Sequence, residues 1–429
     1  MKEPHLRKQR ERPRHLYFVP VPRGLEPVLL AEMEALGLPE AHGAESGAFF
    51  RGTLEDCYRA NLWLRTGARV LRILAEFPCT DEQALYRETR KLDWFRLLSP
   101  DQTLAVRARL GHTAFTHAQY LSRKIKDGIV DQFSETFGRR PSVDARAPHL
   151  QVHAWFHEGR CSLSVDSSGE PLFKRGYRTR KGEAPLRETL AAGLIGLTGW
   201  TGQAPFCDFM TGSGTLAVEA ALIATGRAPG LTREWFGFMN WPDFQRSLWN
   251  RLRAEARGAI RPAPAPILAS DRDERAIAQA RHNAEAAGVA EAIRFAVGDF
   301  RDVEPCSPAS GALGAEPENG RGAAEGPSPA TKLETDPVAP GTGPSTALRT
   351  GPAAGIVLVN PPYGERMGKE LPGLYAALGD VLKQRYKGWE AYVFTVQGEL
   401  IKSIGLRPSR RTILYNGALE CRLLQYRMY

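Results

Sequence analysis

The chain of 429 residues contains neither a long apolar run nor a pattern of paired cysteines. No apolar stretch approaches the roughly 18 residues of a membrane span, and the basic N-terminus lacks the apolar segment of a signal peptide. The six cysteines are scattered without a C-x-x-C pair, so neither a zinc site nor a disulfide framework is indicated. These absences predict a protein of the reducing cytoplasm, with no metal centre and no contact with a membrane.

The basic excess of the chain is concentrated in its first half. The formal net charge is +9, from 57 Lys and Arg against 48 Asp and Glu. Residues 1–182 hold 30 basic and 22 acidic residues, a net of +8, and the remainder is nearly neutral at +1. This distribution is typical of a nucleic-acid-binding module in front of a near-neutral catalytic domain. A basic surface that serves only solubility is the alternative interpretation.

A predicted buried strand at 356–359 ends at the motif Asn360-Pro361-Pro362-Tyr363. Its Ile-Val-Leu-Val run is typical of a strand covered on both faces, and open α/β folds place their chemistry where such strands end. Asn360 offers a carbonyl acceptor held extended by the following proline, and the Pro361 carbonyl is a second acceptor. Two fixed acceptors suit an exocyclic NH2 group, and the ring of Tyr363 can stack on a base. A strand that ends in a plain proline turn is the alternative.

A second motif, PFCDFMTGSGT at 205–215, predicts a short strand, a glycine turn and a helix over 215–224. Gly212 and Gly214 allow a ligand to approach the backbone closely, and the N-terminus of the helix favours a carboxylate or phosphate. The G-x-G-x-x-A spacing also fits a dinucleotide fingerprint. An NAD site requires an acid about 20 residues later, whereas the nearest acid that closes a strand is Asp271, much farther along. The NAD interpretation is therefore the weaker one.

Three acids each close a separate predicted strand. Asp208, before the glycine turn, can accept the ammonium group of a cofactor, and Asp271 can hold both ribose hydroxyls of a nucleoside. Asp299, after a predicted strand at 293–297, can accept from an adenine amine, with the ring of Phe300 beside it. An acid at a strand end is often only a cap or turn residue, so the ordered set is more informative than any single acid.

The ordered motifs resemble class I S-adenosylmethionine-dependent methyltransferases that methylate amino groups. The wider match is to bacterial 23S rRNA (guanine-N2)-methyltransferases with an N-terminal THUMP RNA-binding domain, from about residue 16 to the end apart from an insertion. The segments that carry the resemblance are LFKRGYR at 172–178, EAPLRE at 183–188, NPPYGERMG at 360–368 and NGALEC at 416–421, with YRANLW at 58–63, KIKD at 124–127 and GRRP at 138–141. A related THUMP branch methylates guanine N2 in tRNA, but the Gly-Glu-Arg after NPPY and the NGALEC segment favour the rRNA branch.

Two features depart from the family pattern. Some members carry a second methyltransferase domain, for which the chain to Tyr429 leaves no room. Met210-Thr211 stands where the family often has Met-Cys. We expect this change to be tolerated, because the backbone rather than the side chains shapes the turn.

The resemblance implies an α/β fold, in which a Rossmann-like class I methyltransferase domain follows an N-terminal α+β THUMP-containing RNA-binding domain. The predicted division is a flexible basic tail at 1–15, an α+β subdomain at 16–67, the THUMP domain at 68–168, a basic linker at 169–183 and the methyltransferase domain at 184–429. Residues 305–354 are rich in Pro, Gly, Ala, Ser and Thr. We expect this insertion to be disordered and without a catalytic role.

The implied catalytic residues are Asn360, Pro361, Pro362 and Tyr363. The implied S-adenosylmethionine site comprises Asp208, Met210, Thr211, Gly212, Ser213, Gly214, Thr215, Asp271, Arg272, Asp299, Phe300 and Asn360. Candidate RNA ligands are Arg123, Lys124, Lys126, Arg139 and Arg140 near a predicted helix at 117–137, and Lys174, Arg175, Arg178, Arg180 and Lys181 in the linker. The linker cations alternate with Phe173 and Tyr177, which predicts a groove that delivers RNA. Simple solvation of these charges is the alternative interpretation.

The predicted reaction transfers a methyl group from S-adenosylmethionine to the exocyclic N2 of a guanine in 23S rRNA, and we expect a monomer. Guanine-N2 methylation of tRNA and adenine-N6 methylation stay open as alternatives, since the same acceptor chemistry serves both. A non-catalytic RNA-binding factor with a relic cofactor fold is the alternative from another class, and the intact set of motif residues argues against it.

Overall fold

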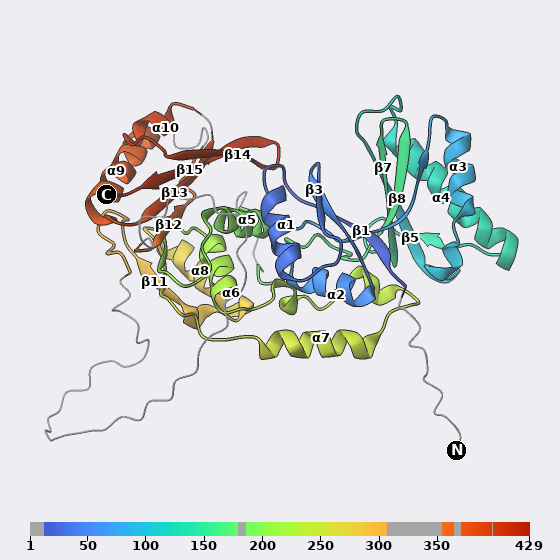
Figure 1. The fold of residues 1–429 in the computed structure, drawn as a ribbon, viewed down its shortest axis with the longest axis horizontal. Coiled ribbons are helices and arrows are strands. Elements are labelled where there is room, and N and C mark those ends of the chain that lie inside the picture. Colours follow the sequence, from blue (N-terminus) through green and yellow to red (C-terminus); the bar gives the residue numbers. More distant parts are fainter. Residues whose placement is uncertain (1–12, 179–185, 307–353, 364–369, 397) are drawn as a thin grey trace, which may run out of the picture.

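The computed structural model describes residues 13–178, 186–306, 354–363, 370–396 and 398–429. Most of the predicted basic tail and of the predicted insertion, together with Arg180 and Lys181, lie outside these ranges. The described residues form two sheets with helices packed on them, one in each half of the elongated molecule (Figure 1).

The first sheet has eight strands in the order β2-β3-β1-β4-β8-β7-β5-β6. Its strands are β1 (His15–Pro20), β2 (His42–Ala44), β3 (Gly47–Gly52), β4 (Leu71–Pro78), β5 (Thr103–Leu110), β6 (Ser142–Val143), β7 (Leu150–His157) and β8 (Arg160–Asp166). Its helices are α1 (Glu26–Ala35), α2 (Leu54–Trp63), α3 (Glu82–Lys91) and α4 (Ala118–Phe137), with a short 3-10 helix η1 (Trp94–Arg96). β1 pairs with β4, with Phe18 opposite Leu71, so one sheet contains strands of both predicted N-terminal units.

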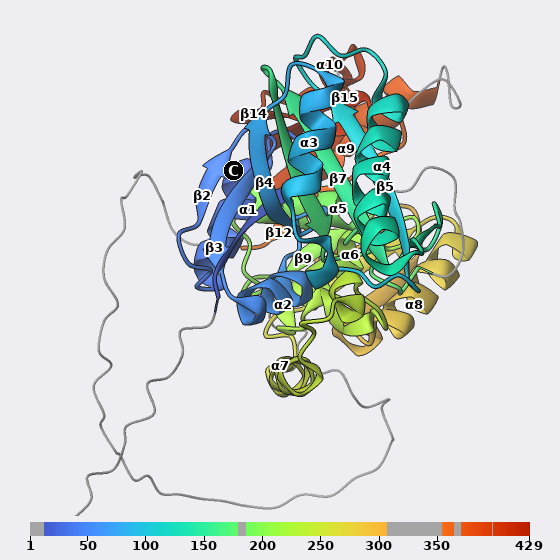
Figure 2. The same ribbon diagram turned by 90° about the vertical axis from the view of Figure 1, so that its right-hand side faces the viewer.

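The first sheet has one covered face and one open face, and the side chains of β7 alternate between them. Successive side chains of a strand point to opposite faces, and Leu150, Val152, Ala154 and Phe156 are buried in one core with residues of α3 and α4. Figure 2 shows both helices in front of the strands. Trp155 points to the other face and is 47% exposed.

The second sheet has seven strands in the order β11-β10-β9-β12-β13-β15-β14. They are β9 (Phe206–Asp208), β10 (Ile267–Asp271), β11 (Ile293–Val297), β12 (Ile356–Val359), β13 (Glu390–Val396), β14 (Arg410–Asn416) and β15 (Leu419–Arg427). The helices of this half are α5 (Glu188–Thr198), α6 (Thr215–Ala224), α7 (Arg246–Gly258), α8 (Glu274–Ala287), α9 (Leu371–Arg385) and α10 (Leu400–Ser403), with 3-10 helices η2 (Pro229–Thr232), η3 (Gly237–Asn240) and η4 (Ala290–Ala292).

The second sheet has a topological switch point between β9 and β12. From β9 the chain proceeds through β10 to β11 and then returns to β12 on the other side of β9, and these strands pair in parallel with one another and with β13. Open α/β sheets bind their ligands at such a point. All four residues of β12 are buried, because elements cover both faces of the central strands. The predicted α/β fold is confirmed.

Neither a membrane span nor a metal-type cluster occurs in the described part of the chain. No helix there is both long and apolar enough to cross a bilayer. The same residues contain no group of three or more His, Cys, Asp or Glu side chains that could hold a metal ion.

Candidate active site

The predicted site residues follow neighbouring strands at one edge of the second sheet. Strands that run in parallel end at the same edge. Asp299, Asp271, Asp208 and Asn360 therefore lie in this order along the carboxyl edge, after or at the ends of β11, β10, β9 and β12. Asp208 and Asn360 flank the switch point, which is where the fold places a ligand.

The glycine turn after β9 is held by the end of β10. The Gly212 N–H donates to Asp271 Oδ2 at 2.9 Å, and the Thr211 N–H donates to the Ser270 carbonyl at 3.0 Å. Asp271 Oδ1 accepts from the Asp273 N–H at 3.1 Å. A carboxylate has about four lone-pair sites, so Asp271 can hold the turn and still accept from hydroxyl groups of a ligand.

The two glycines of the turn differ in what surrounds them. Gly212 has a φ of +52°, and a Cβ added there meets no atom within 4 Å. Gly214 has a φ of +81°, and its added Cβ would lie 2.8 Å from the Cβ of Ala280 on α8. Gly214 is thus required for the packing of α6 against α8, whereas Gly212 borders open space that a ligand can occupy.

Asp208 is a buried carboxyl group at the switch point. It is 1% exposed, and the Met210 N–H donates to its Oδ1 at 3.4 Å. Burial raises the pKa of Asp208 to about 7, because the charged form loses its hydration. A cationic group bound beside Asp208 would favour the ionised form.

Asn360 presents a buried oxygen without a partner. Its Oδ1 accepts no hydrogen bond from any described residue, although the atom is shielded from solvent. An unpaired buried carbonyl costs about 1–3 kcal/mol, and native structures contain few of them. The oxygen is therefore available to a ligand donor at the predicted position.

The backbone of the proline motif is tied to two other elements. Pro361 is buried and Pro362 is exposed. The hydroxyl of Tyr375, on α9, donates to the Pro362 carbonyl at 3.3 Å and lies 2.6 Å from Thr395 Oγ1 on β13. These contacts position the motif at the edge of the sheet.

Tyr363 is anchored by the turn between β14 and β15. The Asn416 side-chain amide donates to the Tyr363 hydroxyl at 3.1 Å, and burial raises the pKa of Tyr363. The sequence motifs contained both residues, but no local pattern indicated that they meet. The one available signal was that both residues belong to segments that carry the family resemblance, NPPYGERMG and NGALEC.

The remaining predicted cofactor residues lie near the same edge. Asp299 forms an ion pair with Arg301 at 3.0 Å. Phe300 is buried and stacks on Phe209, with ring centroids 5.8 Å apart, so most of its surface packs in the core. Met210, Thr211 and Ser213 belong to the glycine turn, Thr215 begins α6, and Arg272 is exposed directly after β10.

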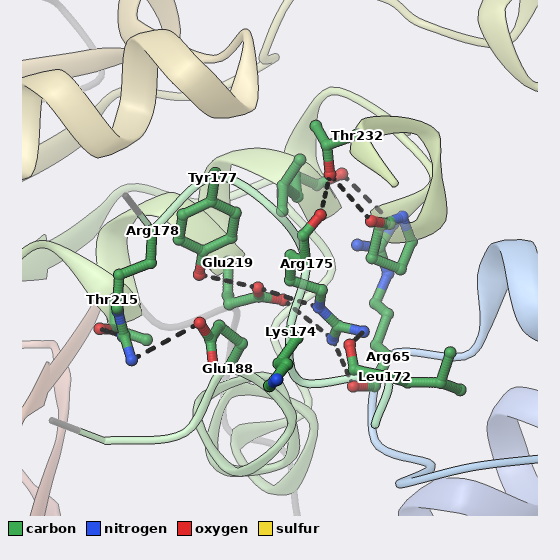
Figure 3. Close-up of polar contacts among 12 residues, drawn as sticks. Arg65, Leu172, Lys174, Arg175, Tyr177, Arg178, Glu188, Thr215, Glu219 and Thr232 are labelled. Carbon is green, nitrogen blue, oxygen red and sulfur yellow. Dashed lines mark hydrogen bonds and ion pairs between the residues drawn. The ribbon is translucent and has the colours of Figure 1, made fainter. Parts of the chain in front are cut away.

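One predicted RNA ligand, Arg175, is instead a buried structural residue, which corrects that prediction. Its side chain is 2% exposed and lies 3.4 Å from both carboxylate oxygens of Glu219 on α6, as Figure 3 shows. It also donates to the carbonyls of Leu172, at 3.0 Å, and Arg65. The buried Tyr177 hydroxyl donates to the same Glu219 at 3.1 Å. Neither Arg175 nor Tyr177 can reach RNA in this arrangement.

Arg178 connects the linker to the cofactor turn. It donates to Thr215 Oγ1 at 2.6 Å and to the Leu186 carbonyl at 3.1 Å, and it lies 3.5 Å from Glu188 (Figure 3). Thr215 begins α6, so Arg178 contacts the first residue of the helix behind the glycine turn. The basic composition of the linker did not reveal this contact.

The other predicted RNA ligands differ in whether another side chain already contacts their charged group. Within the described residues Arg123 and Arg140 are exposed and form no ion pair. Lys126 pairs with Asp127, Arg139 with Asp101 at 2.7 Å and Lys174 with Glu170 at 2.5 Å, and Lys124 lies over the ring of Tyr86. Surface pairs of this kind are weak, so RNA phosphates can compete for these cations.

Three family profiles match the chain. The RMKL-like methyltransferase domain matches residues 175–313 and 335–425. The RlmL ferredoxin-like domain matches residues 17–71, and the THUMP domain matches residues 79–166.

Relatives and a solved structure extend over almost the whole chain. The ribosomal RNA large subunit methyltransferase K/L of Syntrophotalea carbinolica is 37% identical, over 96% of this chain and 53% of that protein. The chain thus spans about half the length of such relatives. The provisionally named RNA methyltransferase slr0064 of Synechocystis sp. is 36% identical, over 96% of this chain and 97% of its own length. The crystal structure of SMU.472, provisionally described as a methyltransferase and complexed with SAH, has a TM-score of 0.78 at 26% identity and covers 97% of this chain and 98% of its own.

Proposed function

This chain belongs to the family of RlmL-like methyltransferases with a THUMP domain, and we propose that it methylates the exocyclic N2 of a guanine in 23S rRNA with S-adenosylmethionine. The resemblance inferred from the motifs is confirmed by the family match. The observation that carries the proposed chemistry is the buried, unpaired Asn360 Oδ1 at the switch point of the second sheet. The names of the K/L relatives support rRNA as the substrate.

The edge of the sheet fits S-adenosylmethionine. Gly212 borders open space next to the N-terminus of α6, which favours the carboxylate of the amino-acid part. Asp208 offers a carboxylate to the ammonium group, Asp271 to the ribose hydroxyls and Asp299 to the adenine amine. These assignments agree with the order of the acids along the edge. When bound, S-adenosylmethionine supplies a methyl group that is already activated by a positively charged sulfur.

The protein contributes acceptors and position. The guanine amine is a weak nucleophile because its lone pair is conjugated with the ring. Asn360 Oδ1 and the Pro361 carbonyl accept its N–H groups, localise the lone pair and aim it, and positioning of this kind supplies a large part of catalysis. Tyr363 holds the flipped base by stacking. The amine loses its proton to solvent after transfer, so a strong base is not required.

Replacement of Asn360 separates this chemistry from cofactor binding. Asn360→Ala is expected to lower turnover by about a hundredfold or more, as for other lost transition-state donors or acceptors, while the dissociation constant for S-adenosylhomocysteine stays near that of the parent. Asp271→Ala is expected to weaken that binding first. Equal losses of turnover and cofactor affinity in Asn360→Ala would exclude the acceptor role.

The substrate is identified by transfer of labelled methyl groups to purified 23S rRNA and to tRNA, followed by nucleoside analysis. N2-methylguanosine in 23S rRNA is the expected product. The same nucleoside in tRNA only, or N6-methyladenosine in either RNA, would replace the proposed substrate with one of the two alternatives. Failure to bind S-adenosylhomocysteine would favour a non-catalytic RNA-binding factor.

A further inference from the structure

The open face of the first sheet carries arginines next to an exposed tryptophan. Strands β5 and β7 pair in parallel, with Arg107 beside His153 and Arg109 beside Trp155. Partners in register point to the same face, which is the face opposite to α3 and α4 (Figures 1 and 2). Arg107 and Arg109 are exposed, and neither side chain forms an ion pair or hydrogen bond with another described residue. We call Arg107, Arg109 and Trp155 the β5–β7 face.

The ring of Trp155 is held in place although it is exposed. It stacks on the ring of His157, with centroids 6.0 Å apart and an angle of 18° between the planes. A Cβ added to Gly111 would lie 2.6 Å from the Trp155 ring, so this glycine makes room for the indole. His157 Nδ1 in turn accepts from the His112 N–H at 3.2 Å. A fixed aromatic plane open to solvent is what base stacking requires.

A groove continues from the β5–β7 face toward the methyltransferase half. It has a volume of about 990 Å³, and its lining includes Arg107, Arg146, Lys174 and Trp235. Trp235 is 39% exposed, and an added Cβ on Gly169 would lie 2.1 Å from its ring, so the indole rests on that glycine. The groove thus combines a second exposed indole with further cations.

Only some cations of the groove are available to a ligand. Arg69 pairs with the buried Asp166, and Arg233 donates to the backbone carbonyls of Ser168, Glu170, Pro171 and Lys174. Arg146 is exposed, and its side chain has no ion pair or hydrogen bond with any described residue. The unpaired cations that line the groove are therefore Arg107 and Arg146, and the exposed carboxylate of Glu234 lines it as well.

We propose that the β5–β7 face and this groove bind a single-stranded segment of RNA, an inference that rests on the proposed RNA substrate. Bases stack on Trp155 and Trp235, and phosphates pair with Arg107, Arg109 and Arg146. Unpaired bases are needed, because the bases of a duplex are already stacked on each other and cannot lie on an indole. The groove is lined in part by Gly169, Glu170, Pro171, Lys174 and Gly176. The same segment continues to Arg178, which contacts Thr215, the first residue of α6. The bound RNA is thereby directed along this segment toward the cofactor turn.

The test is the affinity of the full chain for a labelled single-stranded RNA of about 12 nucleotides, a length within the range of known binding grooves. Arg107→Glu with Arg109→Glu is expected to weaken binding by about tenfold or more, and to lower the slope of log affinity against log salt by about 1.4, for two phosphates at about 0.7 each. Trp155→Ala is expected to weaken binding on the order of tenfold. Trp155→Phe restores a stacking plane and is expected to retain most of the affinity.

A matched control changes the same charge elsewhere. Arg87 on α3 and Arg257 on α7 are exposed and form no ion pair with described residues. Arg87→Glu with Arg257→Glu makes the same change in net charge. It is expected to leave the RNA affinity within about twofold of the parent, apart from the effect of that net charge. Equal weakening in the control and the β5–β7 variant, or full affinity in Trp155→Ala, overturns the proposal. A duplex bound as tightly as the single strand overturns it as well.

A separate measurement distinguishes this proposal from the proposed function. Each variant is also titrated with S-adenosylhomocysteine, and the β5–β7 variants are expected to bind it as the parent does. If the parent does not bind S-adenosylhomocysteine and does not methylate RNA, the proposed function fails. The RNA affinities of the variants still decide where RNA binds. If the parent binds S-adenosylhomocysteine but no single-stranded RNA, the RNA face is refuted and the cofactor site stands.

Discussion

The side-chain amide of Asn416 donates a hydrogen bond of 3.1 Å to the hydroxyl of Tyr363, two residues that lie 53 positions apart. Tyr363 ends the proline motif after β12, and Asn416 ends β14, so the contact joins the central strands to the antiparallel edge of the sheet. A ring that is hydrogen-bonded at its far end has fewer orientations available. We infer that Asn416 is a positioning residue for the aromatic plane that receives the base.

Removal of the Tyr363 hydroxyl tests this positioning. Tyr363→Phe keeps the ring but loses the bond, and we expect turnover on RNA to fall about fivefold, which corresponds to about 1 kcal/mol for one hydrogen bond. Tyr363→Ala also loses the stacking plane and is expected to cost at least another tenfold. Single-turnover methyl transfer measures both effects, and S-adenosylhomocysteine affinity is expected to stay unchanged.

The double variant Tyr363→Phe with Asn416→Ala provides the control. If the two side chains act through their hydrogen bond, the pair is expected to lose no more turnover than either single change. A loss equal to the product of both single losses would show that Asn416 acts in some other way.

Asp208 predicts a dependence of stability and cofactor binding on pH. Its pKa in the folded protein is about 7, far above the usual value of an unfolded Asp, so the folded state binds the proton more tightly. The free energy of unfolding is therefore expected to fall as pH rises from about 4 to 7, by about 1.4 kcal/mol for each pKa unit as an upper bound. Asp208→Asn is expected to remove this loss, and to be more stable than the parent at pH 8 in thermal unfolding.

Cofactor binding is expected to show the opposite trend with pH. The ionised Asp208 attracts the ammonium group, so affinity for S-adenosylhomocysteine rises between pH 6 and 8 in the parent and is weak and flat in Asp208→Asn. Calorimetric titration at both pH values measures this, with the exposed Asp302→Asn as the control. Equal pH profiles for parent and Asp208→Asn would remove Asp208 from the cofactor site.

The two glycines of the turn are expected to respond differently to alanine. The methyl group of Gly212→Ala enters open space, so we expect a loss of about 1 kcal/mol for the left-handed φ and at least a tenfold loss of cofactor affinity. Gly214→Ala collides with Ala280 on α8 and is expected to lose about 1–3 kcal/mol more in unfolding free energy. Chemical unfolding and cofactor titration of both variants separate the two effects. A stability loss in Gly212→Ala as large as in Gly214→Ala would refute the distinction.

Breaking the Arg175–Glu219 pair by removing one partner is expected to cost more stability than removing both charges. Both side chains are almost fully buried, so Arg175→Ala leaves an unpaired charge and is expected to cost about 3–5 kcal/mol. Arg175→Met with Glu219→Leu removes both charges and is expected to be more stable than Arg175→Ala. Urea unfolding measures this, and Lys174→Ala, at an exposed pair, is expected to change stability by about 1 kcal/mol or less. A cost below that of Lys174→Ala would contradict the role of Arg175.

The central elements of the second sheet were predictable from local pattern. The predicted strands at 293–297 and 356–359 and the helix at 215–224 have the observed bounds. A continuous apolar run marks a doubly covered strand, and a glycine turn or Asn-Pro marks where it stops. The ends of parallel strands meet at one edge, so the gathering of the acids and Asn360 at that edge followed from the chain alone. Their spatial order, with Asn360 next to Asp208, was decided by the strand order of the sheet.

The pairing of side chains was decided only by the tertiary structure. Arg175 lies in a basic stretch and was predicted to face RNA, but Glu219, 44 residues later, withdraws it into the core. Three other features likewise depend on elements distant in sequence. They are the pairing of β1 with β4, the Asn416–Tyr363 hydrogen bond and the β5–β7 face. Local sequence determines the period and the ends of an element, because these depend on backbone and near-neighbour chemistry. Which face of an element is covered, and by which partner, depends on packing between segments that the local pattern does not link.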